Sequence, residues 1–147
     1  MSAHSARLLT AAIETRLTAV GVGLLVGVGI KPAGGGWAGA EGASTFTPYT
    51  VIFPTPGGYS DGSLCVPFGD VAPDYTISSF GATVAQAQGG DDRVRAALAS
   101  PGTVVVSGRL VLLAIPDVDG GVLRDDDVQP VIFHAPTRWR FMTTSAA

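Results

Sequence analysis

The stretch DYTISSFGATVAQAQGGDDRVRAALA, residues 74–99, decides the fold class because a strand pattern is followed directly by a helix pattern. Residues 74–80 predict a β-strand, which ends at Gly81. Residues 82–99 predict an α-helix from their composition and from an approximate 3.6-residue repeat of their larger side chains. This order indicates a fold that combines helices with a sheet.

Two adjacent glycines, Gly89 and Gly90, stand in the middle of the predicted second helix. Each costs a helix about 1 kcal/mol relative to alanine. Two interpretations remain open at this point. Either the helix kinks at the glycines, or a new turn begins there with Asp91 or Asp92 as its N-cap.

Outward from this stretch, the chain contains one more helix and several strands. A first helix is predicted from Ser5 to about Ala19 or Val20, because Leu9, Ile13, Leu17 and Val20 form one apolar stripe. Further strand patterns occupy residues 22–30, 49–53, 104–115 (bulged, or a hairpin turning at Ser107-Gly108) and 131–144 (interrupted by Pro136). The order predicts an α+β fold, in which two helices pack on one face of a largely antiparallel or mixed β-sheet. We expect a single domain over residues 1–147.

Composition and charge exclude several classes of protein. Charged residues make up 14% of the 147 residues, against about 25% in an average soluble protein. The net charge of −3 disfavours a protein that grips nucleic acid, which usually carries a basic patch. The single cysteine, Cys65, excludes an internal disulfide framework and is expected to be a buried thiol. The uncharged stretch 17–30 is too short to span a bilayer, so we expect no membrane segment.

Two long loops, residues 33–47 and 116–130, are predicted to carry contacts with neighbouring subunits, because long loops in compact domains are usually functional. The interface candidates are Trp37, Phe46, Asp125, Asp126 and Asp127. The alternative for Trp37 is that it folds back on its own domain. The alternative for both loops is a mobile surface without contacts.

The best enzyme signal is the G-x-S-x-G motif at residues 58–62, with Ser60 in the nucleophile position. Its possible partners follow in the order of an α/β-hydrolase: Asp117 or Asp119, and then His134. The motif needs a helix directly after the serine, and Pro67 and Gly69 would break one. A surface turn is the favoured interpretation, and we expect no enzyme activity.

The candidate metal and cofactor motifs lack residues that such sites require. Residues 117–120 begin like an EF-hand loop, but Val122 and Val128 stand where that loop requires glycine and glutamate. His4 and His134 have no partners at metal-ligand spacing. There is no phosphate-binding G-K-S/T sequence. We therefore expect no metal and no cofactor.

The chain resembles the tail terminator proteins of long-tailed phages that infect actinobacteria. The resemblance rests on a series of segments in order, none of them diagnostic alone: residues 7–17, 49–54, 77–81, 85–88, 92–98, 124–130, 133–135 and 138–141. It implies a subunit of a hexameric ring that caps the tail tube and stops its polymerisation. The implied partners are the tube protein and a head-completion or stopper protein. The implied location is the head-proximal end of the virion tail, after assembly in the cytoplasm of the bacterial host.

The resemblance also implies a ring through which genomic DNA passes without specific binding. A basic lumen would hold phosphates and slow the genome, so the lumen is expected to be neutral or acidic. The candidate lumen residues are Asp91 and Asp92, with the run at 125–127 as a further contributor. The alternative places these aspartates on the outer surface as solubilising groups. Other head–tail connectors and tail tube proteins remain alternative functions, and a small serine hydrolase using Ser60 is the competing class.

Overall fold

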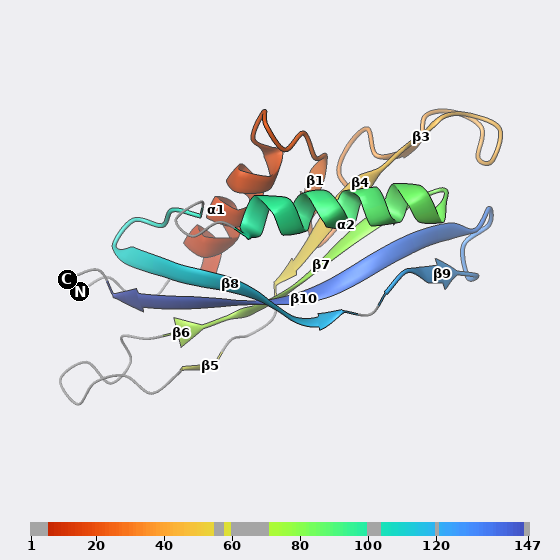
Figure 1. The fold of residues 1–147 in the computed structure, drawn as a ribbon. Helices are drawn as coiled ribbons and strands as arrows, with labels where there is room; N and C mark the ends of the chain where they lie inside the picture. The colour runs from red at the N-terminus through yellow and green to blue at the C-terminus, as the bar shows by residue number, and fades with distance from the viewer. Residues whose placement is uncertain (1–5, 55–57, 60–70, 100–103, 120, 146–147) are drawn as a thin grey trace.

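The computed structural model describes residues 6–54, 58–59, 71–99, 104–119 and 121–145, and it contains two helices and ten strands (Figure 1). The helices are α1 (Ala6–Thr18) and α2 (Val84–Leu98). The strands are β1 (Val26–Val28), β2 (Gly36–Trp37), β3 (Phe46–Thr47), β4 (Tyr49–Pro54), β5 (Gly58–Tyr59), β6 (Val71–Ala72), β7 (Asp74–Gly81), β8 (Arg109–Asp119), β9 (Leu123–Asp125) and β10 (Ile132–Ser145).

The long strand β10 organises the main sheet. One side of β10 pairs with β7, and the sheet continues through β4 to the edge strand β1. The other side of β10 pairs with β9 near its start and with β8 along the rest. The β1–β4 pair is parallel, whereas the other pairs of the sheet are antiparallel. The predicted α+β class, with a mixed and mostly antiparallel sheet, is confirmed.

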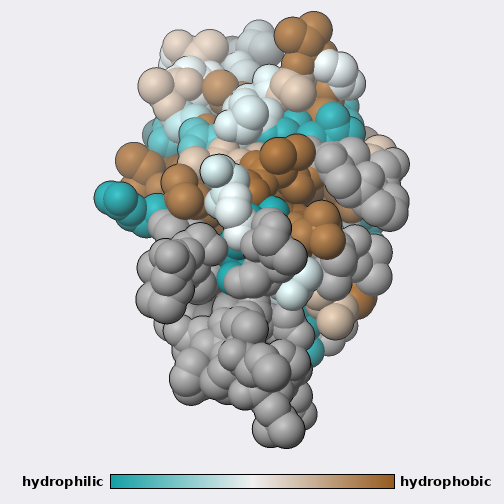
Figure 2. All heavy atoms as spheres, turned by 90° about the vertical axis from the view of Figure 1, so that its left-hand side faces the viewer, coloured by the Kyte–Doolittle hydropathy of each residue, from teal (hydrophilic) through white to brown (hydrophobic). Residues whose placement is uncertain are grey.

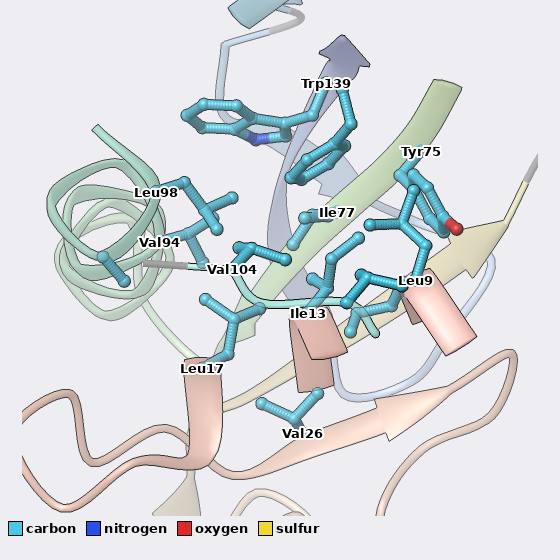
Figure 3. Close-up of a cluster of buried hydrophobic side chains, with 14 residues drawn as sticks. Leu9, Ile13, Leu17, Val26, Tyr75, Ile77, Val94, Leu98, Val104 and Trp139 are labelled. Carbon is cyan, nitrogen blue, oxygen red and sulfur yellow. The ribbon is translucent and has the colours of Figure 1, made fainter. Parts of the chain in front are cut away.

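Both helices pack on the same face of this sheet and enclose the main core (Figure 3). Helix α1 contributes Leu9, Ile13 and Leu17 of the predicted stripe, each at most 2% exposed. Val20, the fourth residue of that stripe, is exposed instead, because α1 ends before it at Thr18. The sheet contributes large side chains from its three central strands, among them Trp139 and Tyr75. Burial of each large apolar side chain stabilises the fold by about 1.5–3 kcal/mol, so this cluster fixes the helices on the sheet.

Pro136 does not interrupt the last strand, contrary to the expectation for residues 131–144. The Phe141 N–H donates to the Pro73 carbonyl, so the odd-numbered residues of β10 direct their N–H groups towards β7. The nitrogen of Pro136 therefore faces the other side. There, pairing with β9 ends at His134 and pairing with β8 starts at Thr137. Proline stands in the gap between two partner strands, where it removes no ladder hydrogen bond.

Helix α2 runs through Gly89-Gly90 without ending, and its N-cap is Thr83, whose hydroxyl accepts a hydrogen bond from the Gln86 N–H. Neither Asp91 nor Asp92 begins a new turn. A Cβ atom added to Gly90 would lie 2.8 Å from the Cβ of Ser79 on β7. Gly90 is thus a position of close helix–sheet packing, which a larger residue would prevent.

Two other sequence expectations are corrected, and the open choice at residues 104–115 is resolved in favour of a turn at Ser107-Gly108. The segment 33–47 contains the antiparallel pair β2–β3, and 116–130 contains the end of β8 and all of β9, so neither is an irregular loop throughout. The strand expected over 22–30 is confined to Val26–Val28. At Ser107-Gly108 the chain makes a tight turn, with Gly108 at φ 75° and the Arg109 N–H bonded to the Val106 carbonyl, and β8 begins after it. The proposed cap Ser5 lies outside the described residues.

Candidate assembly surfaces

The two segments predicted to make subunit contacts lie together at one end of the molecule (Figure 1). The β2–β3 pair and the connection from β9 to β10 line a shared hollow of about 190 Å³. Gly42, between β2 and β3, faces Pro130, because a Cβ atom at Gly42 would lie 3.4 Å from that ring. Residues 33–47 and 116–130 are distant in sequence, so only the tertiary structure makes them one surface.

Aromatic rings join this end to the face of the sheet opposite the helices. Trp37 is half-buried and meets Phe46 edge-on, with ring centroids 5.1 Å apart. Phe46 is 6% exposed and continues to Tyr49, which stacks on Phe80 at 4.9 Å. Trp37 therefore packs against its own chain while part of its ring stays accessible. Phe46 is mainly a core residue, because it belongs to a second cluster of buried side chains that also contains Tyr49, Val51 and Ile132.

Residues 123–128, LRDDDV, form what we call the acidic tip. Asp126 forms an exposed ion pair with Arg124, and Asp125 accepts a hydrogen bond of 3.1 Å from the Asp127 N–H. Among the described residues, the Asp127 carboxylate has no hydrogen-bond or ion-pair partner. Burial raises the pKa of the Tyr49 hydroxyl, and the negative charge of Asp125 raises this pKa further.

The two lumen candidates on α2 differ in their surroundings. Asp91 is held by its own chain: it accepts 2.7 Å from Arg95 Nε and 2.9 Å from the Thr137 hydroxyl. Asp92 is exposed. Asp91 thus joins α2 to β10, a role that the sequence pattern did not suggest, whereas Asp92 directs a carboxylate to the surface.

In the sequence, Arg138 and Arg140 alternate with Trp139 and Phe141, which predicts a half-buried strand with its charged residues outward, and the structure confirms this pattern. Trp139 and Phe141 are buried in the core, and Arg138 and Arg140 are exposed. Both arginines bind the Asp74 carboxylate, each at 3.0 Å. The hydrogen bond from Arg140, more than any other contact, lowers the pKa of Asp74, and Arg138 acts in the same direction against the effect of burial. These basic residues are therefore neutralised locally in part.

Sequence reasoning missed a groove between α2 and the α1–β1 connection. One hollow of about 420 Å³ is lined by Arg16, Gly21, Val22, Gly23, Arg93, Ala96 and Ala97. A second of about 430 Å³ shares Gly23 and Arg93 and extends over Leu24, Leu25 and Tyr49 towards Gly89. We call the two together the arginine groove. Small residues on α2 and the connection leave it open, and no pattern in the sequence brings Arg16 and Arg93 together.

Apolar side chains gather at the end of the molecule where α1 and β8 begin (Figure 2). Leu8 on α1 is 52% exposed, and Leu110 on β8 is 54% exposed. Monomeric proteins rarely expose large contiguous apolar patches, and those that exist often mark interaction sites.

Of the residues in the serine hydrolase hypothesis, the structure describes the side chain of His134. His134 lies on β10, stacked on Phe80, and its buried Nδ1 has no hydrogen-bond partner within the described part of the chain. A hydrolase triad would place a carboxylate at this nitrogen. Asp117 and Asp119 lie in β8, while Ser60, Pro67, Gly69, Cys65 and His4 are outside the described residues.

Two further properties hold for the part of the chain that the structure describes. In that part of the chain no group of three or more His, Cys, Asp or Glu side chains could hold a metal ion. No helix in it is both long and apolar enough to cross a membrane.

No protein family matches the sequence, and no curated protein matches it. The fold is similar to that of a chain in a structure described as the virion of a native gene transfer agent (GTA) particle. The TM-score is 0.63 at 17% sequence identity, over 98% of this chain and 100% of that chain. The two chains therefore share a fold along almost their full lengths.

Proposed function

We propose that this protein is a virion structural protein, and specifically a tail terminator that forms a ring at the head-proximal end of a phage tail. The observation that carries the proposal is the full-length similarity of fold to a chain of a GTA virion particle. The surface adds support, because assembly would bury the partly exposed apolar groups near the starts of α1 and β8.

The proposed mechanism is capping by shape complementarity, without catalysis. A ring of six copies covers the growing face of the tail tube and removes the site to which the next tube subunit would add. Its opposite face receives the head-completion or stopper protein. The surface at Trp37 and the acidic tip is proposed to contact a neighbouring subunit.

The lumen is proposed to be acidic, so that the genome passes without being held. Each copy carries a net charge of −3, and a ring multiplies this charge. Asp92 and residues 125–127 are the proposed contributors, together with Asp91, although Arg95 neutralises the Asp91 carboxylate in part. Tight, salt-sensitive binding of duplex DNA by the purified protein would contradict this part of the proposal.

The direct test is polymerisation of the cognate tube protein with and without this chain. A terminator should stop elongation and appear by electron microscopy once per tube, at one end. Density repeated along the tube would instead assign the chain as a tube subunit. Binding to the completed head without any effect on tube length would assign it as a stopper. We expect the isolated protein to be largely monomeric at low salt, because like charges repel, and to form rings on tube ends.

A further inference from the structure

The arginine groove and the acidic tip lie at opposite edges of the main sheet. The groove is bordered by the connection that leads into β1, which is one edge strand. The tip includes β9, which pairs with β10 at the other edge. Strands β4, β7 and β10 lie between β1 and β9. Tyr49 lines the groove and also lines a hollow that it shares with Val128 of the tip. Among the described residues of one chain, no carboxylate of the tip forms an ion pair with Arg16 or Arg93.

The groove is chemically suited to an acidic segment that also carries apolar side chains. Arg16 donates through Nε to the Ala97 carbonyl at 2.9 Å, which holds its guanidinium at the rim. Arg93 is exposed and, within the described part of the chain, forms no hydrogen bond or ion pair. Among the residues that the structure describes, no acidic side chain lines either hollow, and Leu24 and Leu25 provide apolar surface beyond the arginines.

The acidic tip has the matching composition. Its three carboxylates and one guanidinium give residues 123–128 a net charge of −2. Leu123 is 45% exposed and Val128 is 41% exposed, so apolar side chains flank the carboxylates. The Asp127 carboxylate is available for a partner, because its own backbone N–H, rather than its side chain, bonds to Asp125.

We propose that the acidic tip of one copy occupies the arginine groove of the next copy, with Asp127 facing Arg93. In this arrangement residues 125–127 lie between subunits, and Asp91 and Asp92 remain as contributors to the lumen. The occupant is a second copy of this chain, because charge and apolar character are complementary between two surfaces that one molecule carries on opposite edges. A contact between different surfaces of identical subunits is heterologous, and it generates a ring when the rotation closes. Only the closure of these contacts into a ring rests on the proposed function, because the contact between two copies can be measured without a tail tube.

Charge exchange tests the contact in the full-length protein. Self-association is measured by sedimentation equilibrium for Arg93→Glu, for Asp127→Arg and for the double variant. The protein concentration is high and the salt is about 0.15 M, which screens the repulsion between net charges more than it screens a partly buried pair. Each single change should lower the association constant by about tenfold, as expected for the loss of a close interfacial charge pair. The double variant should recover most of the loss, because the reversed charges again face each other.

Glu14→Arg is the matched control for Asp127→Arg, since it makes the same charge change on α1 away from the groove lining. It should alter association by less than about twofold. A double variant no better than the single variants would overturn the proposal. The proposal would also be overturned if Arg93→Glu left self-association unchanged and lost only binding to the tube protein, or only binding to duplex DNA.

The same variants separate this inference from the proposed function. If tubes are capped normally while charge exchange has no effect on self-association, the contact is wrong and the terminator function stands. If charge exchange restores self-association but the wild-type chain never caps a tube, the terminator function is wrong and the contact stands.

Discussion

The hydroxyl of Thr137 on β10 donates a hydrogen bond of 2.9 Å to the carboxylate of Asp91 on α2. Thr137 is 1% exposed, and Arg95 completes the cluster by binding both side chains. This contact joins the middle of the second helix to the central strand of the sheet, beside the close approach of Gly90 to Ser79.

Asp91→Ala should lower the free energy of unfolding by about 1–3 kcal/mol, because it removes the acceptor of a buried hydroxyl and a charged partner of Arg95. Asp92→Ala, one residue along and exposed, is the control and should change it by less than about 0.5 kcal/mol. Urea denaturation of the two variants checks the difference. Equal effects would show that the Thr137 contact does not stabilise the fold.

The adjacent glycines of α2 should respond in opposite directions to the same substitution. Gly90→Ala forces a methyl group against Ser79 and should destabilise the protein by about 1–3 kcal/mol. Gly89→Ala meets nothing within 4 Å and should stabilise it by up to about 1 kcal/mol through helix propensity. Thermal unfolding of both variants is the measurement. A stabilising Gly90→Ala would mean that the helix does not approach β7 as closely as described.

Asp74 should make the stability depend on pH at the acidic end. Its pKa is lower in the folded protein, so its contribution is present above the unfolded pKa and is lost as pH falls through the folded one. The stability difference between the wild type and Asp74→Asn should therefore shrink as pH falls from about 5 towards 2. Arg140→Gln should reduce this dependence more than Arg138→Gln, because the Arg140 hydrogen bond is the larger cause. Denaturation curves across this pH range are the measurement. If the arginines act only as surface charges, Arg140→Gln and Arg138→Gln should show the same pH dependence of stability.

Residues 36–47 and 123–130 should exchange amide hydrogens more slowly in the assembled tail than in the free subunit. The reason is burial of the shared surface at this end of the molecule, where both segments line one hollow. Residues 75–80 of β7, in the middle of the sheet, serve as the internal control and should be protected in both states. Equal and fast exchange of the two segments in both states would reject the contact.

The sequence alone determined the type and position of most elements. The apolar stripe of Leu9, Ile13 and Leu17 is a local property of the chain, and it correctly predicted both a helix and its buried face. The same holds for the strands over 49–53, 74–80 and 131–144, whose patterns reflect burial on a sheet. Local patterning also separated the buried Trp139 and Phe141 from the exposed arginines beside them.

Tertiary structure decided what local patterns left open. Helix propensity puts a cost on Gly89-Gly90, but only the proximity of Ser79 explains why α2 continues through them. Pro136 is compatible with β10 only because its nitrogen faces the gap between β8 and β9. The shared surface of residues 33–47 and 116–130, and the approach of Arg16 to Arg93, depend on packing between segments distant in the chain. Periodicity records which side of an element is buried, whereas the partner that buries it is chosen by the packing of the whole fold.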